Sequence, residues 1–256
     1  GDKYSAYFTQ EEYETASNNV NGEYAGIGIT LTAEDKTNKK IITEVQEDKP
    51  GAKAGLKMGD EVISVNGTDV TQLSLSDTVD QIRGEEGRES VLGIRRKTDG
   101  KEKTFTVTVK AEKIVSQSVS AKLLKGKLGY VRVQTFNNKT SEQFESALKS
   151  LDDKGQKGLI IDLRDNGGGA LSAARNMLDD LLPAGDLITE ENRGEESKSY
   201  RSTDERHFDK PIVVLINGGS ASASEVFSGT LQDRKAATLV GVKSYGKGII
   251  QTIFSL

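Results

Sequence analysis

The chain has 256 residues, of which 34% are hydrophobic and 27 are glycine, a composition at the lower edge of the globular range and a length sufficient for one large or two ordinary domains. Its 35 basic and 39 acidic residues give a net charge of -4, which argues against nucleic acid or an anionic membrane surface as the main partner. No apolar run approaches the ~18 residues of a membrane span. The absence of cysteine excludes disulfides and thiol catalysis and leaves the redox compartment open.

The first part of the chain, to about residue 112, predicts a small β-rich module. Runs rich in β-branched residues predict four strands, and the pair Asp99-Gly100 predicts a turn between the last two. One helix is expected over Leu75–Ile82, ending at Gly84. The predicted strands are 41–46, 61–67, 89–97 and 103–110.

From about Lys127 the pattern changes to alternating strands and helices. Apolar residues recur at helical spacing in 141–151, and short apolar runs predict strands buried on both faces. This alternation predicts the α/β class, with a mostly parallel sheet covered by helices. The polar stretch 190–202 is expected to be a solvated hairpin or loop. Strands are expected at 128–136, 158–164, 212–217 and 237–242, and further helices at 170–182, before Pro183, and at 222–234.

Two glycine-flanked segments near the end of the chain carry a serine and a lysine. Ser222 stands at the centre of residues 217–229, and Lys247 lies between two glycines, 25 positions further on. A serine hydroxyl needs a neighbouring base to act as a nucleophile. A lysine amine is a base only when neutral, a form that apolar surroundings favour, and Gly248–Ile250 follow Lys247.

Other residues complete or compete with this pair. The amide of Gln251, four residues after Lys247, is placed to orient the lysine amine. The one histidine, His207, lies in a polar stretch, and we expect it in a surface loop rather than in catalysis. A lysine between glycines also suggests phosphate binding, but the pattern G-x-x-x-x-G-K-[ST] is absent and Gly248 follows Lys247.

Ser222 is expected at a junction where a strand ends and a helix begins. The unpaired N–H groups of a first helical turn can stabilise an oxyanion, and the N–H of Ala223 is the natural first donor. A second donor is expected from the glycine loop Asn166–Gly169. The alternative for a serine at such a junction is an ordinary helix N-cap. Glu225, one turn beyond Ser222, is expected to make a structural hydrogen bond, and the alternative is that it touches the site.

A further charged pair lies at the end of the predicted strand 158–164. We expect Asp162 and Arg164 to form a structural salt bridge or a loop brace.

The combined pattern resembles the C-terminal processing peptidases, also called tail-specific proteases. It consists of LIIDLRDNGGG, then NGGSASASE, then SYGKGIIQ. The resemblance covers nearly the whole chain and implies a crotonase-like α/β protease core with a β-rich PDZ domain. It implies that Ser222 is the nucleophile, Lys247 the general base and Gln251 its support. It also implies that Ala223 and Gly168 donate to the oxyanion.

The resemblance extends to the β-rich module. Residues 49–70 resemble the core of a PDZ domain, and the segment Gly26, Ile27, Gly28 and Ile29 stands where such domains carry their carboxylate-binding loop. A substrate tail would then add as a strand to the sheet edge. By itself this segment is also compatible with an ordinary glycine-rich strand entry. The resemblance further implies a regulatory role for Arg83, linking the occupied PDZ domain to the active site.

These inferences define the expected organisation and function. Residues 1–24 are expected to lead into a PDZ domain at 25–112, with a serine protease domain at 113–256 that is truncated at its C-terminal end. We expect a Ser/Lys endopeptidase acting near protein C-termini, with no metal or organic cofactor because the chain supplies nucleophile, base and oxyanion donors. The alternative is a catalytically idle, PDZ-type peptide-binding module.

The resemblance also implies where such a protein acts and with what it associates. The expected partners are proteins or peptides with a free C-terminus, together with membrane association of the full-length form and a homo-oligomer. The implied location is the bacterial cell envelope or, in photosynthetic organisms, the thylakoid lumen.

Overall fold

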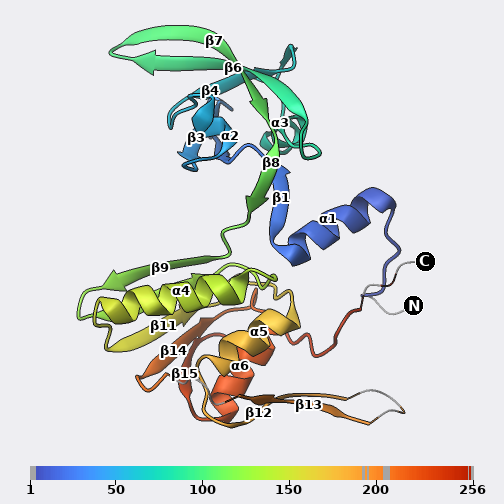
Figure 1. Ribbon diagram of the computed structural model, residues 1–256, viewed down its shortest axis with the longest axis vertical. Helices are drawn as coiled ribbons and strands as arrows, with labels where there is room; N and C mark the ends of the chain where they lie inside the picture. The colour runs from blue at the N-terminus through green and yellow to red at the C-terminus, as the bar shows by residue number, and fades with distance from the viewer. Residues whose placement is uncertain (1–3, 192–193, 195, 204–207, 253, 255–256) are drawn as a thin grey trace. The chain divides into compact units, whose positions relative to one another are not determined.

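The computed structural model describes residues 4–191, 194, 196–203, 208–252 and 254. The chain divides into two compact units (Figure 1). Glu23–Val115 form the β-rich unit, and Gly1–Gly22 together with Ser116–Leu256 form the α/β unit. Among the described residues, no helix combines the length and apolar character needed to cross a membrane.

The β-rich unit is built around a sheet with the order β2-β3-β4-β6-β7, in which the short strand β5 pairs with β4. All four strands predicted from the sequence are present, and the predicted helix coincides with α3. The elements of the sheet are β2 (Ile29–Ala33), β3 (Lys40–Val45), β4 (Glu61–Val65), β5 (Thr68–Asp69), β6 (Glu89–Thr98) and β7 (Lys101–Lys110). The others are α2 (Pro50–Lys53), α3 (Leu75–Ile82) and a separate antiparallel pair of β1 (Glu23–Gly26) and β8 (Glu112–Val115).

Local sequence explains the ends of these elements. Asp99 and Gly100 both have positive φ, 51° and 78°, the backbone that a two-residue hairpin between β6 and β7 requires. Ser74 caps α3, because its hydroxyl accepts the Asp77 N–H at 3.1 Å. These signals lie close together in the sequence, so the element boundaries could be predicted without the tertiary fold.

The α/β unit contains a sheet with the order β15-β14-β11-β10-β9, in which only β9 is antiparallel. Helix α5 contacts both α4 and α6, so the three helices form one layer beside the sheet (Figure 1). The strands are β9 (Val119–Leu124), β10 (Leu128–Val133), β11 (Gly158–Asp162), β14 (Ile212–Ile216) and β15 (Ala237–Gly241). The helices are α4 (Thr140–Asp153), α5 (Leu171–Asp179) and α6 (Ala223–Asp233), and the polar stretch forms a hairpin of β12 (Gly185–Glu190) and β13 (Lys198–Ser202).

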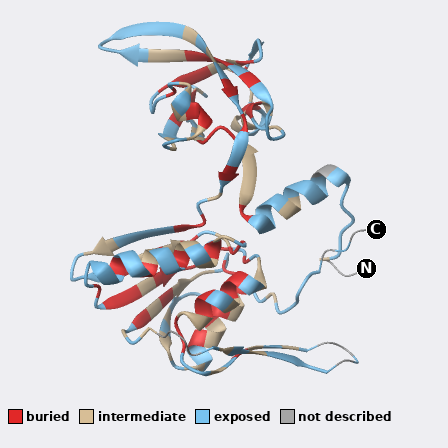
Figure 2. Cartoon of the chain, viewed as in Figure 1, coloured by how far each residue is buried: buried red, intermediate tan, exposed pale blue. Residues whose placement is uncertain are grey.

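The buried faces of this sheet and helix layer form the core of the α/β unit (Figure 2). The rings of Phe136 and Phe227 lie 6.0 Å apart, centroid to centroid. Phe136 follows β10 and pairs with Gly169 of one glycine loop, while Phe227 belongs to α6. The packing therefore joins that loop to the helix that begins after Ser222.

Two features of the α/β unit differ from the sequence analysis. The run 237–242 was expected to be buried on both faces, but β15 is the edge strand of the described sheet, and Val240 and Val242 are 50% and 66% exposed. Helix α1 (Gln10–Asn21) was not predicted. Its signal was present: Thr9 and Glu12 form a capping box, and an Asn18–Asn19–Gly22 turn closes the helix.

Candidate active site

Two glycine-containing loops follow neighbouring parallel strands and meet at the carboxyl ends of those strands. The loop after β11 contains Asn166, whose carbonyl accepts the Ala221 N–H at 3.0 Å and the Ser224 hydroxyl at 2.8 Å. The hydroxyl of Ser220 donates to the carbonyl of Leu163 at 2.7 Å. The loop after β14 is therefore fixed against the loop after β11, as expected for a site at the carboxyl ends of parallel strands.

Ser222 occupies the junction between β14 and α6. It is the N-cap residue of α6 and has φ 54° and ψ -116°. A positive φ is uncommon for a residue other than glycine, and such strain persists only where the surrounding structure enforces it. The sequence prediction of a strand-to-helix junction at Ser222 is confirmed.

Glu225 joins the serine segment to the lysine segment. Its Oε2 accepts the N–H of Ser222 and the N–H of Lys247, each at 2.8 Å, and its Oε1 accepts the N–H of Gly246 at 2.6 Å. A separate bond, from the Tyr245 N–H to the Ser220 carbonyl at 3.0 Å, ties the same two segments. The expected structural role of Glu225 is confirmed, and its partners come from both segments.

These contacts also set the protonation of Glu225. Burial by itself would raise the pKa of this carboxyl group, but hydrogen bonds from the Ser244 side chain and from the N–H groups of Lys247, Gly246 and Ser222 outweigh it. The pKa is therefore held below its ordinary value of 4.5. Glu225 is accordingly charged at neutral pH.

The side chain of Lys247 is engaged with Gln251 and with the N-terminal segment. Its Nζ donates to Gln251 Oε1 and lies 5.0 Å from the centroid of the Tyr4 ring, while Gln251 Nε2 donates to the Tyr4 carbonyl at 2.6 Å. No hydrogen bond joins Nζ to Ser222 Oγ in the part of the chain that the structure describes. The expected apolar surroundings are not formed, because Ile249 and Ile250 are 45% and 58% exposed.

Gly168 packs directly against Ser222. It has φ 101°, and a Cβ atom placed on it would lie 2.7 Å from the Ala221 carbonyl oxygen and 2.9 Å from both the Ala223 nitrogen and Ser222 Cβ. The Gly168 N–H donates to Asn166 Oδ1 at 2.9 Å. The N–H of Ala223 has no acceptor among the described residues. Only glycine therefore fits at 168, and the N–H of Ala223 is available to a ligand.

Asp162, the last residue of β11, fixes the end of that strand before the glycine loop. Its fully buried carboxylate accepts hydrogen bonds from the Tyr130 hydroxyl at 2.7 Å, from Arg132 at 3.1 Å and from Arg164, whose guanidinium approaches to 2.7 Å. Burial would raise the pKa of Asp162, but the Arg164 and Tyr130 hydrogen bonds lower it far more. The expected salt bridge and brace is confirmed.

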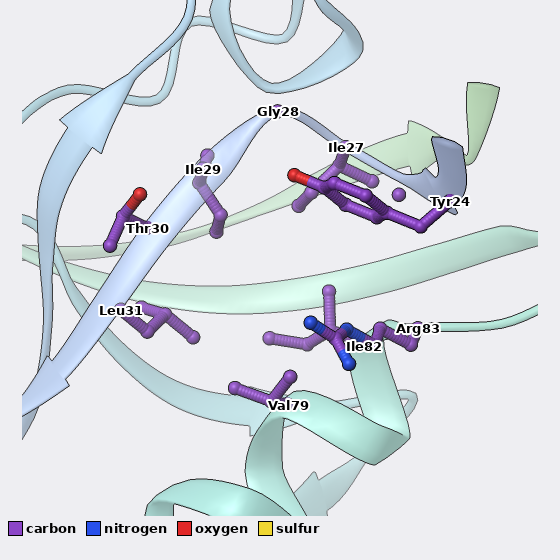
Figure 3. A pocket seen from close by; sticks show the side chains of 10 residues that line it. Tyr24, Ile27, Gly28, Ile29, Thr30, Leu31, Val79, Ile82 and Arg83 are labelled. Carbon is purple, nitrogen blue, oxygen red and sulfur yellow. The ribbon is translucent and has the colours of Figure 1, made fainter. Parts of the chain in front are cut away.

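A cavity of about 250 Å³ lies within the β-rich unit, between the edge strand β2 and helix α3. Figure 3 shows the side chains of Ile29, Leu31, Val79 and Ile82 pointing toward this space. The cavity is therefore mainly apolar and open along an unpaired strand edge, the form of site to which an extended peptide adds as a strand.

The segment Gly26–Ile29 forms one end of this cavity. The N–H groups of Ile27 and Gly28 have no acceptor among the described residues. Gly28 has φ 73°, and a Cβ atom on it would lie 2.3 Å from Lys49 Cβ. Arg83 also borders the cavity, with its guanidinium carbon 5.6 Å from the centroid of the Tyr24 ring.

Sequence reasoning missed several residues of the α/β unit. Tyr4 gave no sequence signal, because nothing in one sequence brings residue 4 to residue 247. The roles of Asn166 and Ser224 follow from the meeting of two loops, although small polar residues before a helix are a general sign of loop hydrogen bonding. His207 lies outside the described residues.

Comparisons with known proteins identify the family to which the two parts of the chain belong. Residues 127–256 match peptidase family S41 and residues 19–95 match the PDZ domain. The chain is 35% identical to the carboxy-terminal-processing protease of Bartonella bacilliformis, over all of this chain and 59% of the relative. It is 33% identical to a probable CtpA-like serine protease of Staphylococcus aureus, over 98% of this chain and 50% of the relative. The chain thus spans between half and three fifths of the length of these curated relatives.

Solved structures show the same fold. A photosystem II D1 C-terminal processing protease matches 92% of this chain and 64% of its own, with 30% identity and a TM-score of 0.50. A putative S41 protease from Bacteroides fragilis matches 96% of this chain and 75% of its own, with 18% identity and a TM-score of 0.52, and supports the fold alone. The S41 match covers more than half of the chain and contains both glycine loops, Ser222 and Lys247, so the chain belongs to peptidase family S41 and carries a PDZ domain.

Proposed function

We propose that this chain is the PDZ and catalytic part of a serine endopeptidase that cleaves proteins near their C-termini. The proposal is carried by the Glu225 carboxylate, which binds the backbone of Ser222 and the backbone of Lys247 through one oxygen atom. A strained serine at the start of a helix and a lysine from a second segment are thereby held in one site. This arrangement supports a Ser/Lys dyad with Gln251 as the group that orients the lysine amine.

The dyad would work by acyl transfer. Ser222 Oγ attacks the carbonyl carbon of the scissile peptide bond while its proton passes to neutral Lys247 Nζ. Collapse of the tetrahedral intermediate breaks the C–N bond, and Lys247 returns the proton to the leaving amine. Lys247 then takes a proton from water as the water attacks the acyl-enzyme carbonyl carbon. Collapse of this second intermediate breaks the C–Oγ bond, releases the new carboxyl terminus and returns the proton from Lys247 to Ser222 Oγ. Both steps require Nζ to come within about 3 Å of Oγ, from its present hydrogen bond to Gln251.

The oxyanion formed in these steps would be stabilised by backbone N–H groups. The N–H of Ala223 is the first donor, because it begins α6 and has no acceptor among the described residues. Gly168 is the second, because it packs against Ser222. Its N–H donates to Asn166 Oδ1 in this structure, so the oxyanion would have to share or replace that bond.

The PDZ domain would bind the free C-terminus of the substrate. The unoccupied N–H groups of Ile27 and Gly28 suit a terminal carboxylate, and the apolar cavity beside β2 suits the last side chain of the tail. Arg83, at the border of that cavity, is proposed to report its occupancy to the active site. The curated relatives reported above are bacterial proteins. From the family resemblance, we extend the proposal to an extracytoplasmic location, membrane association of the full-length form and a homo-oligomer.

Hydrolysis of an unstructured protein such as casein tests this function. We expect Ser222→Ala and Lys247→Ala to abolish cleavage while binding of a tail peptide survives. Lys243→Ala is the matched control, because Lys243 is an exposed lysine four residues before Lys247. If the wild type cleaves no faster than Ser222→Ala, the chain is a peptide-binding module instead. Loss of cleavage and peptide binding together in one variant would indicate misfolding of that variant.

A further inference from the structure

Two side chains outside the proposed dyad bind each other across the two glycine loops. Asn217 Oδ1 accepts the Asp165 N–H at 2.9 Å, and Asn217 Nδ2 donates to Asp165 Oδ1 at 2.8 Å. The same Oδ1 accepts the N–H of Gly219 at 3.0 Å. Asp165 belongs to the loop after β11 and Asn217 to the loop after β14, so this reciprocal pair joins loops that are 52 residues apart in the chain.

The backbones meet closely at this pair. A Cβ atom on Gly219 would lie 2.9 Å from Asp165 Cα and 3.0 Å from Asp165 Oδ1. Asp165 itself has φ 60°, a conformation that aspartate adopts more readily than most residues and that local hydrogen bonds stabilise. The spacing of the two loops is therefore set by hydrogen bonds at a point where no larger residue fits between them.

Each loop leads from this pair to a group of the proposed site. Three residues after Asp165 stands Gly168, and five residues after Asn217 stands Ser222. Gly168 and Ser222 are in direct contact, so a change in the spacing of the loops moves the proposed oxyanion donor relative to the nucleophile.

We propose that Asp165 and Asn217 are positioning residues that fix the oxyanion-stabilising loop against the nucleophile loop. They act through the backbones of Gly168 and Ser222 and touch no reacting atom. The proposal rests on the function proposed above, because it assigns the pair a role in that reaction. It predicts that the hydrogen-bond complementarity of the pair matters, and not the identity of either residue.

Exchanging the two functional groups tests this complementarity. Asn217→Asp keeps an oxygen for the N–H groups of Asp165 and Gly219 but sets a second carboxylate oxygen against the Asp165 carboxylate. Asp165→Asn alone keeps an acceptor for Asn217 Nδ2. In the double variant the new amide at 165 donates to the new carboxylate at 217, which restores the pair.

With a peptide substrate, we expect Asn217→Asp to lower kcat about tenfold with little change in KM, and the double variant to recover to within about threefold of wild type. Asp165→Asn should stay within about threefold, as should Asn18→Asp, which adds the same charge at an exposed position of α1. If the pair has a merely structural role, Asn217→Asp will lower the unfolding temperature, but either kcat will not fall or the double variant will not restore it. Wild-type kcat in Asn217→Asp, or a double variant no better than Asn217→Asp, would overturn the proposal.

Hydrogen–deuterium exchange separates this proposal from the function on which it rests. We expect Asn217→Asp to speed amide exchange in both 165–169 and 217–224, and the double variant to restore protection in both. Faster exchange confined to 217–224 would refute the coupling of the loops, even if the wild type cleaves peptides. A wild type that cleaves nothing would refute the proposed function, while the exchange result would still decide whether the pair couples the loops.

Discussion

Ser222 and Lys247 donate their backbone N–H groups to the same oxygen atom, Oε2 of Glu225, each at 2.8 Å. The relationship holds the two segments of the proposed dyad together by their main chains. It leaves both reacting side chains free of the tether. The hydroxyl and the amine can therefore approach or separate while their backbones stay in place.

Glu225→Gln is expected to lower kcat by about 10²-fold with a smaller change in KM. The substitution replaces one accepting carboxylate oxygen by an amide NH₂, which repels the backbone N–H groups that the oxygen bound and so displaces the dyad. Hydrolysis of a peptide substrate measures the loss. Glu142→Gln serves as the control, since Glu142 is an exposed glutamate in the first turn of α4. Wild-type kcat in Glu225→Gln would show that the tether is dispensable.

The same carboxylate should contribute a pH-dependent part of the free energy of unfolding. The pKa of Glu225 is lower in the folded state than its ordinary 4.5, so the stabilisation is present above pH 4.5 and is lost as the pH falls through the folded-state value. The difference in unfolding temperature between wild type and Glu225→Gln should therefore shrink below about pH 4.5. If the difference in unfolding temperature grows as the pH falls, the pKa of Glu225 is not lowered by folding.

Asp162→Asn is expected to destabilise the α/β unit by about 2 kcal/mol at neutral pH, because the buried carboxylate accepts hydrogen bonds from Tyr130, Arg132 and Arg164. The pKa of Asp162 is lowered by folding, so the effect should be full above about pH 5 and decline as the pH falls below its ordinary 3.8. Thermal unfolding across pH measures it. Asp153→Asn, at an exposed position of α4, should change the unfolding temperature little.

Gly168→Ala and Gly167→Ala form a matched pair of adjacent substitutions. Gly168 has φ 101° and no room for a Cβ atom, whereas a Cβ on Gly167 would meet nothing within 4 Å. We expect Gly168→Ala to lower kcat by about 10²-fold by pushing the loop away from Ser222, and Gly167→Ala to stay within about threefold of wild type. Equal effects of the two substitutions would show that the contact of Gly168 with Ser222 has no catalytic importance.

Val79→Lys is expected to weaken binding of a tail peptide at least tenfold, because it brings a charge to the wall of the apolar cavity beside β2. Fluorescence anisotropy with a labelled peptide measures this, and the C-terminal amide of the same peptide should bind weakly to the wild type. Val91→Lys, at an exposed position of β6, should bind as the wild type does. Undiminished binding to Val79→Lys would place the peptide elsewhere.

Arg83→Ala tests the proposed link between the PDZ domain and cleavage. We expect it to reduce the stimulation of casein cleavage by an added tail peptide, while cleavage without added peptide and the unfolding temperature change little. Lys103→Ala is the control at an exposed position of β7. Unchanged stimulation in Arg83→Ala would end the regulatory assignment.

Much of the fold can be predicted from the sequence because many of its helices, strands and turns are determined by neighbouring residues. The hairpin turn at Asp99-Gly100, the helix over Leu75–Ile82 and the buried strand Gly158–Asp162 each depend on neighbouring residues. Helix α1 was missed although Thr9 and Glu12 gave its capping box, since its surface is mostly polar and lacks a strong apolar stripe. An apolar run does not reveal whether it lies at a sheet edge, so the sequence predicts an interior strand at 237–242 where the structure has the edge strand β15.

The sequence by itself determined that Ser222 stands at a strand-to-helix junction and that Lys247 and Gln251 follow at a spacing resembling one peptidase family. Only the tertiary structure decided how these residues meet. It brought one carboxylate of Glu225 to the N–H groups of two segments, placed Tyr4 beside Lys247, and paired Asp165 with Asn217. The physical reason is that a helix cap or a turn depends on adjacent residues. A hydrogen bond between loops forms only after the fold brings the carboxyl ends of parallel strands together.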